Sequence, residues 1–377
     1  MPLLAASLTD DPRLVAGLAT TYALVRLLVA LPIGVWVDRI DRRTILIVAN
    51  LIRGLVVVTL ALSLQLEVGS LPLLYAALAV VGTLESAADN ASVSLLPSIV
   101  PGEQLDQANG RISAAQLVAD EFAGPPLGGL LFALGSAAPM YLMGGLWAAA
   151  GFIALALPMR RMGARTGVET SQRRPVFREA LEGIRWLAGH RTVGGLALVG
   201  ALASVGYMLT FSILVLFAEQ NLALDAVGYG VILAVSALGG LVGSFTTARV
   251  ARWIGYRWTI VTSLLTGAAS LFALSATTSG AVAAVLLAVY ILHAVVWGTC
   301  ATSLRQKLVP DVLRGRVNAA SRVLSLLGLA LGSTLGGLLA VASLPLPIAV
   351  GGAVFVGCAM LAALLLGPSA HGRAPNG

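Results

Sequence analysis

The feature that most constrains the fold of this chain is a series of apolar stretches, each long enough to cross a lipid bilayer. A transmembrane helix needs about 20 predominantly apolar residues. Charged residues make up 11% of the sequence, whereas a soluble domain carries roughly 25%. The sequence therefore predicts an all-α membrane protein with eleven complete transmembrane helices, at 14–37, 44–65, 72–98, 110–134, 137–158, 193–218, 227–249, 258–277, 281–304, 317–342 and 346–366.

The basic residues are concentrated in alternate connections between these stretches. They cluster at 38–43, 159–192, 249–257 and 305–316, whereas the intervening connections contain no Lys or Arg. Basic loops stay on the cytoplasmic side of a membrane. We therefore expect a multi-pass protein of a cell membrane, in this case the cytoplasmic membrane of a bacterium, with the C-terminus and the 159–192 connection in the cytoplasm. The net charge of +7 then reflects topology and contact with membrane lipids, and no nucleic-acid partner is expected.

The connection 159–192 is the longest polar segment and divides the chain. Its second part, VFREALEGIRWLAG, places Phe177, Leu181, Ile184 and Leu187 on one helical face. This pattern predicts an amphipathic helix on the cytoplasmic membrane surface. A tether between two bundles is favoured over a regulatory segment.

The two parts on either side of this linker resemble each other when the numbering is shifted by 209. Gly34 then meets Gly243, Pro101 meets Pro310 and Asn109 meets Asn318. Repeated membrane halves are typical of transporters with a substrate site near the midplane. We predict two six-helix bundles, an N-terminal one at 1–158 and a C-terminal one at 193–377, joined by the linker.

The repeat predicts a partner for the helix 193–218 at about −16 to 9, before the first residue of the chain. Only MPLLAASL would remain of that first span, too short to cross a bilayer. We therefore expect the first transmembrane helix to be largely missing from this sequence, through either an internal start or a truncation.

Several motifs resemble those of the major facilitator superfamily. GVWVDRIDRRTIL, from Gly34 to Leu46, resembles the signature between helices 2 and 3, and GPPLGG, from Gly124 to Gly129, resembles the fifth-helix motif of its antiporters. Two further segments, 85–101 and 313–321, resemble the drug-efflux branch that includes macrolide exporters and the enterobactin exporter. The resemblance covers the chain apart from its first helix.

This resemblance assigns two sets of residues to conformational change. A tight charged turn can form ion pairs in only one of two conformations. We therefore expect a conformational gate at Gly34, Asp38, Arg39, Arg42 and Arg43. Topological anchoring is the alternative for that turn. Glycines four apart allow close helix packing and prolines bend a helix, so we expect a bend and seal at Gly124, Pro125, Pro126, Gly128 and Gly129. Simple packing is the alternative there.

Ionisable side chains within the apolar stretches are candidates for proton coupling. Each costs about 2.5–3.5 kcal/mol at the bilayer centre, so these groups should be paired or face water. The candidates all lie in the first half of the chain: Arg26, Arg53, Glu85, Asp89, Asp120 and Glu121. From a rise of about 1.5 Å per residue, we expect the pairs Arg53–Asp89 and Arg26–Glu121.

Asp120 and Glu121 point about 100° apart on a helix. Asp120 continues the stripe of Gly124 and Gly128, which leaves Glu121 to face the central cavity and carry the proton. A permanent ion pair is the alternative for Glu121, Asp89 and Glu85. In the second half, His293 is favoured as a group hydrogen-bonded to a neighbouring helix over a proton relay, and Arg322 is near enough to the cytoplasmic end to snorkel.

These observations predict a secondary transporter that exports amphipathic small molecules or drugs by proton antiport. The energy source would be the proton gradient, with no cofactor and no metal, and the two-bundle plan works as a monomer. Uptake or flipping of a lipid or metabolite, and a non-transporting membrane protein, remain alternatives. No catalytic constellation is recognisable in the cytoplasmic parts, so an enzyme is not expected.

Overall fold

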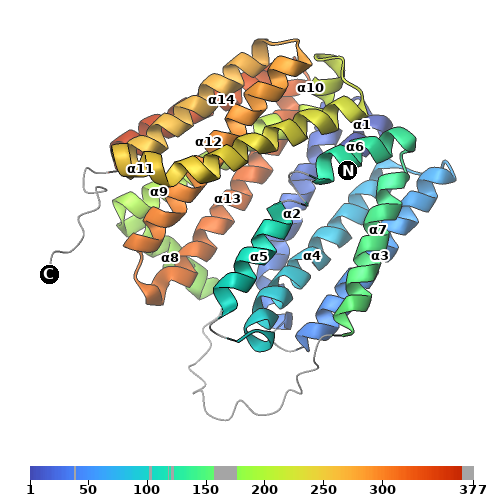
Figure 1. The fold of residues 1–377 in the computed structure, drawn as a ribbon, viewed down its shortest axis with the longest axis horizontal. Coiled ribbons are helices and arrows are strands. Elements are labelled where there is room, and N and C mark those ends of the chain that lie inside the picture. The colour runs from blue at the N-terminus through green and yellow to red at the C-terminus, as the bar shows by residue number, and fades with distance from the viewer. Residues whose placement is uncertain (38–39, 102–103, 118, 120–122, 157–175, 367–377) are drawn as a thin grey trace. The chain divides into compact units, whose positions relative to one another are not determined.

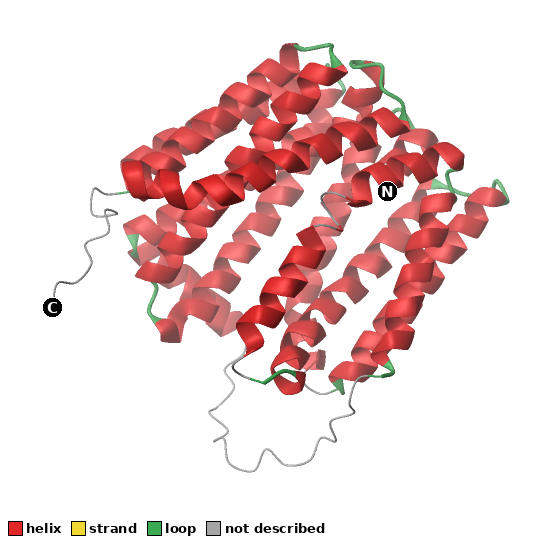
Figure 2. Ribbon diagram, viewed as in Figure 1, coloured by secondary structure: helices red, strands yellow, loops and turns green. Residues whose placement is uncertain are grey.

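The computed structural model describes residues 1–377 except 38–39, 102–103, 118, 120–122, 157–175 and 367–377 (Figure 1). The described chain is helical and contains no strand (Figure 2). Its helices are α1 (Pro2–Leu8), α2 (Pro12–Val37), α3 (Arg42–Gln65), α4 (Leu71–Ile99), α5 (Leu105–Leu117), α6 (Gly124–Leu134), α7 (Ala138–Ala154), α8 (Val176–Gly189), α9 (Arg191–Phe211), α10 (Leu214–Gln220), α11 (Ala226–Ala276), α12 (Gly280–Leu308), α13 (Asp311–Ala340) and α14 (Pro345–Leu365).

The chain forms two compact units. The first unit comprises Met1, Leu3–Leu8 and Thr21–Pro175, and the second comprises Pro2, Thr9–Thr20 and Val176–Gly377. The division falls within the predicted linker 159–192.

Eight of the described helices are long and apolar enough to cross a membrane, and α6 and α7 are shorter apolar helices. One of the eight, α11, is 51 residues long and contains two of the predicted spans. Its two parts are separated at Gly255, where the backbone leaves the helical conformation with φ 76° and ψ 162°. The apolar pattern therefore identified the spans, and the turn between two of them is a single residue.

Gly255 adopts a backbone conformation that is essentially restricted to glycine. Replacing it with alanine is expected to cost about 1–3 kcal/mol and to lower the Tm of the purified protein by about 2–10 °C. Gly315→Ala is the matched control, because a Cβ at Gly315 would meet no atom within 4 Å. Thermal unfolding in detergent would measure both, and an unchanged Tm for Gly255→Ala would contradict the expectation.

Short polar side chains mark where helices begin. The carboxylate of Asp41 accepts hydrogen bonds from the backbone N–H groups of Arg43 and Thr44 at the start of α3, and Asp225 accepts one from Gly228 at the start of α11. These bonds satisfy donors that have no partner within the helix. Before α2, Asp11 binds the side chain of Arg13 at 2.7 Å, and this hydrogen bond lowers the pKa of Asp11.

Within the predicted continuous helix 110–134 the structure has two α-helices, and Ala119 and Ala123 between them are π-helical. α5 ends at Leu117, and α6 begins at Gly124 with Pro125 and Pro126 in its first turn. Proline is well suited to that position, because the first N–H groups of a helix have no intrahelical acceptor. The two prolines therefore lie in the first turn of α6, directly after the π-helical Ala123. Residues 120–122 lie outside the described residues, so the bend expected from the sequence stays a prediction.

The internal repeat is visible in how each unit is packed. In the first unit α3 packs against α4 and α7, and in the second α11 packs against α12 and α14 (Figure 1). The guanidinium group of Arg43 donates to the carbonyl oxygens of Ala154 and Leu155 at the end of α7. That of Arg257 donates to the carbonyl oxygen of Ala363 in α14 at 2.6 Å. Both units thus use an arginine to bind the last carbonyls of a helix, where a positive charge is favourable.

The predicted amphipathic helix is present as α8 and packs against α13 of the second unit. A Cβ at Gly183 would overlap the carbonyl oxygen of Arg316, and Glu182 binds the guanidinium of Arg316 at 2.8 Å. Leu187 belongs to a buried apolar cluster with residues of α9 and α13. Part of the apolar face of α8 is therefore covered by protein, and its contact with a membrane surface remains a prediction.

Candidate functional site

A network of charged and aromatic side chains connects α2 and α4 of the first unit. The guanidinium of Arg26 binds Glu85 at 3.5 Å and Asp89 at 3.0 Å. It also donates to the phenolic oxygen of Tyr22 at 2.7 Å, and the Tyr22 hydroxyl donates to the second oxygen of Glu85 at 3.0 Å. Arg26 therefore binds both carboxylates directly, and Tyr22 links it to Glu85 a second time.

The sequence spacing explains how this network forms. Tyr22 and Arg26 are four residues apart on α2, and Glu85 and Asp89 are four apart on α4, so each pair lies on one helical face. Gly82 lies one turn before Glu85, and a Cβ there would lie 3.2 Å from the Tyr22 ring. The glycine allows α4 to approach α2 closely enough for hydrogen bonding.

The side chains of the network differ in exposure. The exposed fraction is 17% for Arg26, 30% for Glu85 and 52% for Asp89. Asp89 is therefore the most exposed side chain of the network.

Arg53 is buried on α3 and faces α7. Its guanidinium donates to the side-chain oxygen of Asn50 and lies 4.7 Å from the centroid of the Trp147 ring. No carboxylate among the described residues lies within ion-pair distance of it, and its Nε has no hydrogen-bond partner. The cation is held by an amide and an aromatic face, an arrangement that stabilises a desolvated guanidinium.

The expected pair Arg53–Asp89 was therefore wrong, because Asp89 binds Arg26. Estimated depth placed Arg53 and Asp89 at the same level, but depth does not fix which neighbouring helix a side chain faces. The expected partner of Arg26, Glu121, lies outside the described residues, and Arg26 has Glu85 and Asp89 as partners.

Several other predicted residues also lie outside the described part of the chain, namely Asp120 beside Glu121, and Asp38 and Arg39 of the predicted gate. Gly34 is part of α2 and Arg42 is the first residue of α3. Arg43, the remaining gate residue, binds α7 of its own unit. Asp41, in the same turn, caps the start of α3.

The glycine stripes of the two halves differ in their surroundings. In the second half, Gly328, Gly332 and Gly336 lie against backbone carbonyl oxygens of α9, so small residues there allow close helix packing. In the first half, a Cβ at Gly128 would meet no atom within 4 Å, and one at Gly124 would lie 2.7 Å from the carbonyl oxygen of Ala119 in its own chain segment. Gly129 is buried. The predicted close contact at Gly128 is therefore absent among the described residues.

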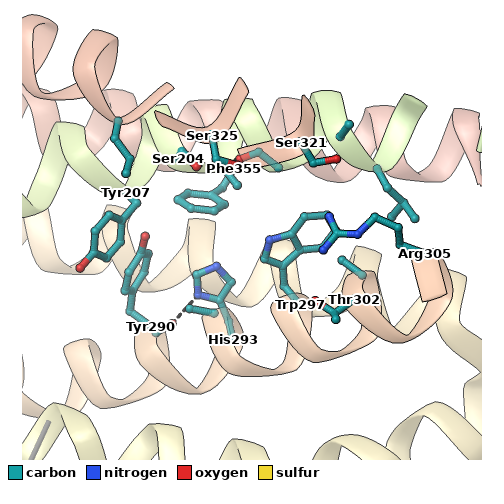
Figure 3. Close-up of a pocket in the computed structure, with 18 residues that line it drawn as sticks. Ser204, Tyr207, Tyr290, His293, Trp297, Thr302, Arg305, Ser321, Ser325 and Phe355 are labelled. Carbon is teal, nitrogen blue, oxygen red and sulfur yellow. Dashed lines mark hydrogen bonds between the residues drawn. The ribbon is translucent and has the colours of Figure 1, made fainter. Parts of the chain in front are cut away.

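The second unit contains a cavity of about 280 Å³ between α9, α12, α13 and α14. Aromatic and hydroxyl side chains line much of it, and Arg305 is its one charged residue among those described. Figure 3 shows Arg305 and Trp297 at one end of the row of labelled side chains and Tyr207 at the other. The sequence analysis did not identify this cavity, because its lining residues come from four helices and resemble ordinary core residues.

His293 lies in the wall of this cavity with 1% of its surface exposed. Its Nδ1 is 2.5 Å from the carbonyl oxygen of Tyr290, so Nδ1 carries the proton, because a carbonyl can only accept. The opposite ring edge faces Gly267, and Nε2 has no partner. Tyr290 and Phe355 contact the ring edge-on. His293 is hydrogen-bonded within its own helix, whereas the sequence analysis expected a neighbouring helix as its partner.

The sequence analysis missed three residues that contact the charged groups of the first unit. Tyr22 belongs to the network between α2 and α4, and Asn50 and Trp147 contact Arg53. The spacing of four between Tyr22 and Arg26, matched by Glu85 and Asp89, was the available signal for Tyr22. Nothing in the sequence indicates that Trp147 of α7 faces Arg53, because that contact depends on how α3 and α7 pack.

The family described as Major Facilitator Superfamily matches this chain in two segments, residues 1–303 and 196–377. None of the curated proteins matches the chain. The two matches together cover the whole sequence.

Solved structures share the fold. A bacterial homologue of the iron transporter ferroportin, in an inward-facing state, is 21% identical over 96% of this chain and 92% of its own, with a TM-score of 0.72. A bacterial homologue of the human lysosomal transporter Spinster is 17% identical over 97% and 89%, with a TM-score of 0.68. A mutant of the nucleoside transporter NupG is 12% identical over 96% and 92%, also with a TM-score of 0.68.

Proposed function

This chain belongs to the Major Facilitator Superfamily, and from that premise we propose that it exports amphipathic small molecules in exchange for protons. It is a multi-pass membrane protein with a transporter fold. In our proposal it acts in the cytoplasmic membrane of a bacterium as a monomer, with its linker and C-terminus in the cytoplasm. The proton gradient supplies the energy, and no cofactor, metal or enzymatic step is involved.

The observation that carries the proposal is the sharing of Arg26 by Glu85 and Asp89. Ionisable groups within a membrane mark ion pathways and proton relays. When Asp89 takes up a proton, Arg26 retains Glu85 and Tyr22 as partners, so the network accepts a proton without leaving a cation unpaired. A carboxylate that gains and loses a proton in this way can couple proton entry to a conformational change.

The coupling in this proposal is conformational and does not require contact between proton and substrate. A ligand shifts an equilibrium only by its difference in affinity for the two states. If substrate favours the state in which Asp89 is ionised and bound to Arg26, substrate binding releases a proton, and by linkage protonation releases substrate. Glu121 remains a second proton-carrying candidate from the sequence, and the turn at 38–43 and the segment at Gly124–Gly129 are proposed to move with the transition.

Proton release from purified protein tests the proposal. A panel of a lipophilic cation, a macrolide and an aromatic acid is added in weakly buffered detergent solution, and a pH-sensitive dye reports the protons released. We expect release from the parent that is lost in Asp89→Asn, because the amide cannot titrate. Comparison with Glu121→Gln decides between the two carboxylates: loss in that variant alone would assign the proton to Glu121.

Direction is tested in vesicles that contain the purified protein. Export predicts movement of a compound that binds, driven by an imposed proton gradient and opposite to it. Movement in the same direction as the proton would instead support uptake, and movement of a lipid between leaflets would support flipping. Binding with neither proton release nor movement would support a non-transporting membrane protein.

A further inference from the structure

The cavity of the second unit has a charge that indicates which compounds it accepts. Arg305 is the only charged side chain among its described lining residues, and neither aspartate nor glutamate contributes to the lining. The Nε of Arg305 is buried without a hydrogen-bond partner, and no carboxylate of the described residues lies within ion-pair distance. The guanidinium of half-buried Arg305 therefore has no anionic partner among the described residues and can bind an anion that enters the cavity.

The remainder of the lining is suited to a ring. Trp297 lies about two helical turns before Arg305 on α12, and Tyr207 and Phe355 enter from α9 and α14 (Figure 3). The Tyr207 ring stacks on Phe211 and lies parallel to that of Tyr290. Rings presented in this way bind another aromatic ring favourably.

One hydroxyl group of the cavity lining has no hydrogen-bond partner among the described residues. Ser321 lines the cavity and its hydroxyl has no hydrogen-bond partner among the described residues, although the residue is 6% exposed. Ser and Thr hydroxyls can donate to an anion. The opposite wall at His293 is apolar in character, because the Nε2 edge of the ring is turned toward Gly267.

We propose that this cavity binds an amphipathic organic acid, with the carboxylate at Arg305 and Ser321 and an aromatic ring against Trp297. The inference rests on the proposed function and names its substrate class. About 280 Å³ is at the lower end of the size range of small-molecule sites, which favours an acid of one or two rings over a long-chain lipid. Because no carboxylate of the described residues lies beside Arg305, a lipophilic cation is repelled from the same site.

Binding of three matched compounds to the purified protein tests this inference. They are 1-naphthaleneacetate, its primary amide 1-naphthaleneacetamide, and the amine 1-naphthylethylamine, and calorimetry measures each Kd in detergent without a proton gradient. A hydrogen bond to a charged partner is stronger than a neutral one by an amount equivalent to roughly tenfold in affinity. We expect the acid to bind about tenfold more tightly than the amide and the amine to bind most weakly.

Two substitutions separate the charge from the ring. Arg305→Gln is expected to weaken acid binding about tenfold and to leave the amide within about threefold. Trp297→Ala is expected to weaken the acid and the amide alike, by about three- to tenfold, because both share the ring. Arg322→Gln is the matched control, since Arg322 is exposed on α13 and does not line the cavity. Arg305→Lys retains the charge and tests the site if the glutamine variant does not fold.

Equal affinity for the acid and the amine, or unchanged acid binding in Arg305→Gln, would overturn the inference. Tighter binding of octanoate than of 1-naphthaleneacetate would overturn the aromatic class and indicate a fatty acid. Failure of the proposed function is distinguishable: acid binding that depends on Arg305 but releases no proton leaves this inference standing and removes proton coupling. Proton release from the protein on addition of the lipophilic cation, without binding of the acid, would support proton coupling and overturn this inference.

Discussion

Replacing Arg26 with glutamine is expected to reduce transport by about 100-fold while the protein still folds. The guanidinium of Arg26 is the shared partner of Glu85 and Asp89, and its removal leaves two carboxylates one turn apart on α4 without that positive charge. Removing one partner of a buried ion pair costs about 3–5 kcal/mol. Because Asp89 is half-exposed, we expect the lower end of that range. In the proposed cycle the network forms in one of two transport states, so losing about 3 kcal/mol from that state shifts the equilibrium between them, and with it transport, about 100-fold.

Further variants distinguish a loss of charge from a loss of shape. Arg26→Lys retains the charge but not the forked geometry that reaches two carboxylates, and intermediate transport is expected. Adding Asp89→Asn to Arg26→Gln removes one uncompensated carboxylate, so the double variant should be more stable to heat than Arg26→Gln alone. Arg252→Gln is the control, because Arg252 is exposed and binds only a carbonyl of its own helix. Transport by Arg26→Gln at the rate of Arg252→Gln would exclude a role for the network.

Replacing Gly239 with alanine is expected to destabilise the protein more than any other glycine-to-alanine substitution in the second unit. A Cβ at Gly239 would overlap the carbonyl oxygen of Ala288, and the Cα and carbonyl carbon of that residue also lie within contact distance. The obstacle is backbone, so no rotation of a side chain relieves it, and α11 and α12 would have to separate. Overpacking of this kind costs about 1–3 kcal/mol or more, and we expect the Tm to fall by about 5–10 °C.

Gly357→Ala provides the comparison within the same unit. A Cβ at Gly357 on α14 would meet no atom within 4 Å, and alanine is favoured over glycine in a helix by about 1 kcal/mol. This variant should therefore have a Tm equal to the parent or slightly higher. Thermal unfolding of both variants in detergent measures the difference, and equal Tm values would contradict the close contact between α11 and α12.

Much of the fold follows from the sequence, because the membrane imposes a simple rule on it. A bilayer offers no partners for backbone hydrogen bonds, so apolar stretches of sufficient length form helices. This rule holds for α3, for α14 and for both parts of α11. The turn at Gly255 between those two parts is not predicted, because in the sequence it is one glycine among many. The rule does not predict that Ala119 and Ala123, just before Pro125 and Pro126, are π-helical.

The candidate site was predictable only in its composition. The sequence shows that Arg26, Glu85 and Asp89 need polar partners, because an ionisable group in an apolar span is costly. It does not show which partners they take, and the expectation that Arg53 would bind Asp89 failed. A helix presents its residues around a full turn, and the packing of neighbouring helices selects which side chains meet.

The sequence by itself thus determined that this chain is a helical membrane protein built as a repeat, since span length and basic loops depend on local composition. Only the tertiary structure decided that Arg26 is shared by Glu85 and Asp89, that Trp147 faces Arg53, and that the described lining of the cavity beside Arg305 includes no acidic residue. Those arrangements depend on the rotation of each helix about its axis and on its neighbours. Both are fixed by close packing at positions such as Gly82 and Gly239, where one methyl group would change the distance between two helices.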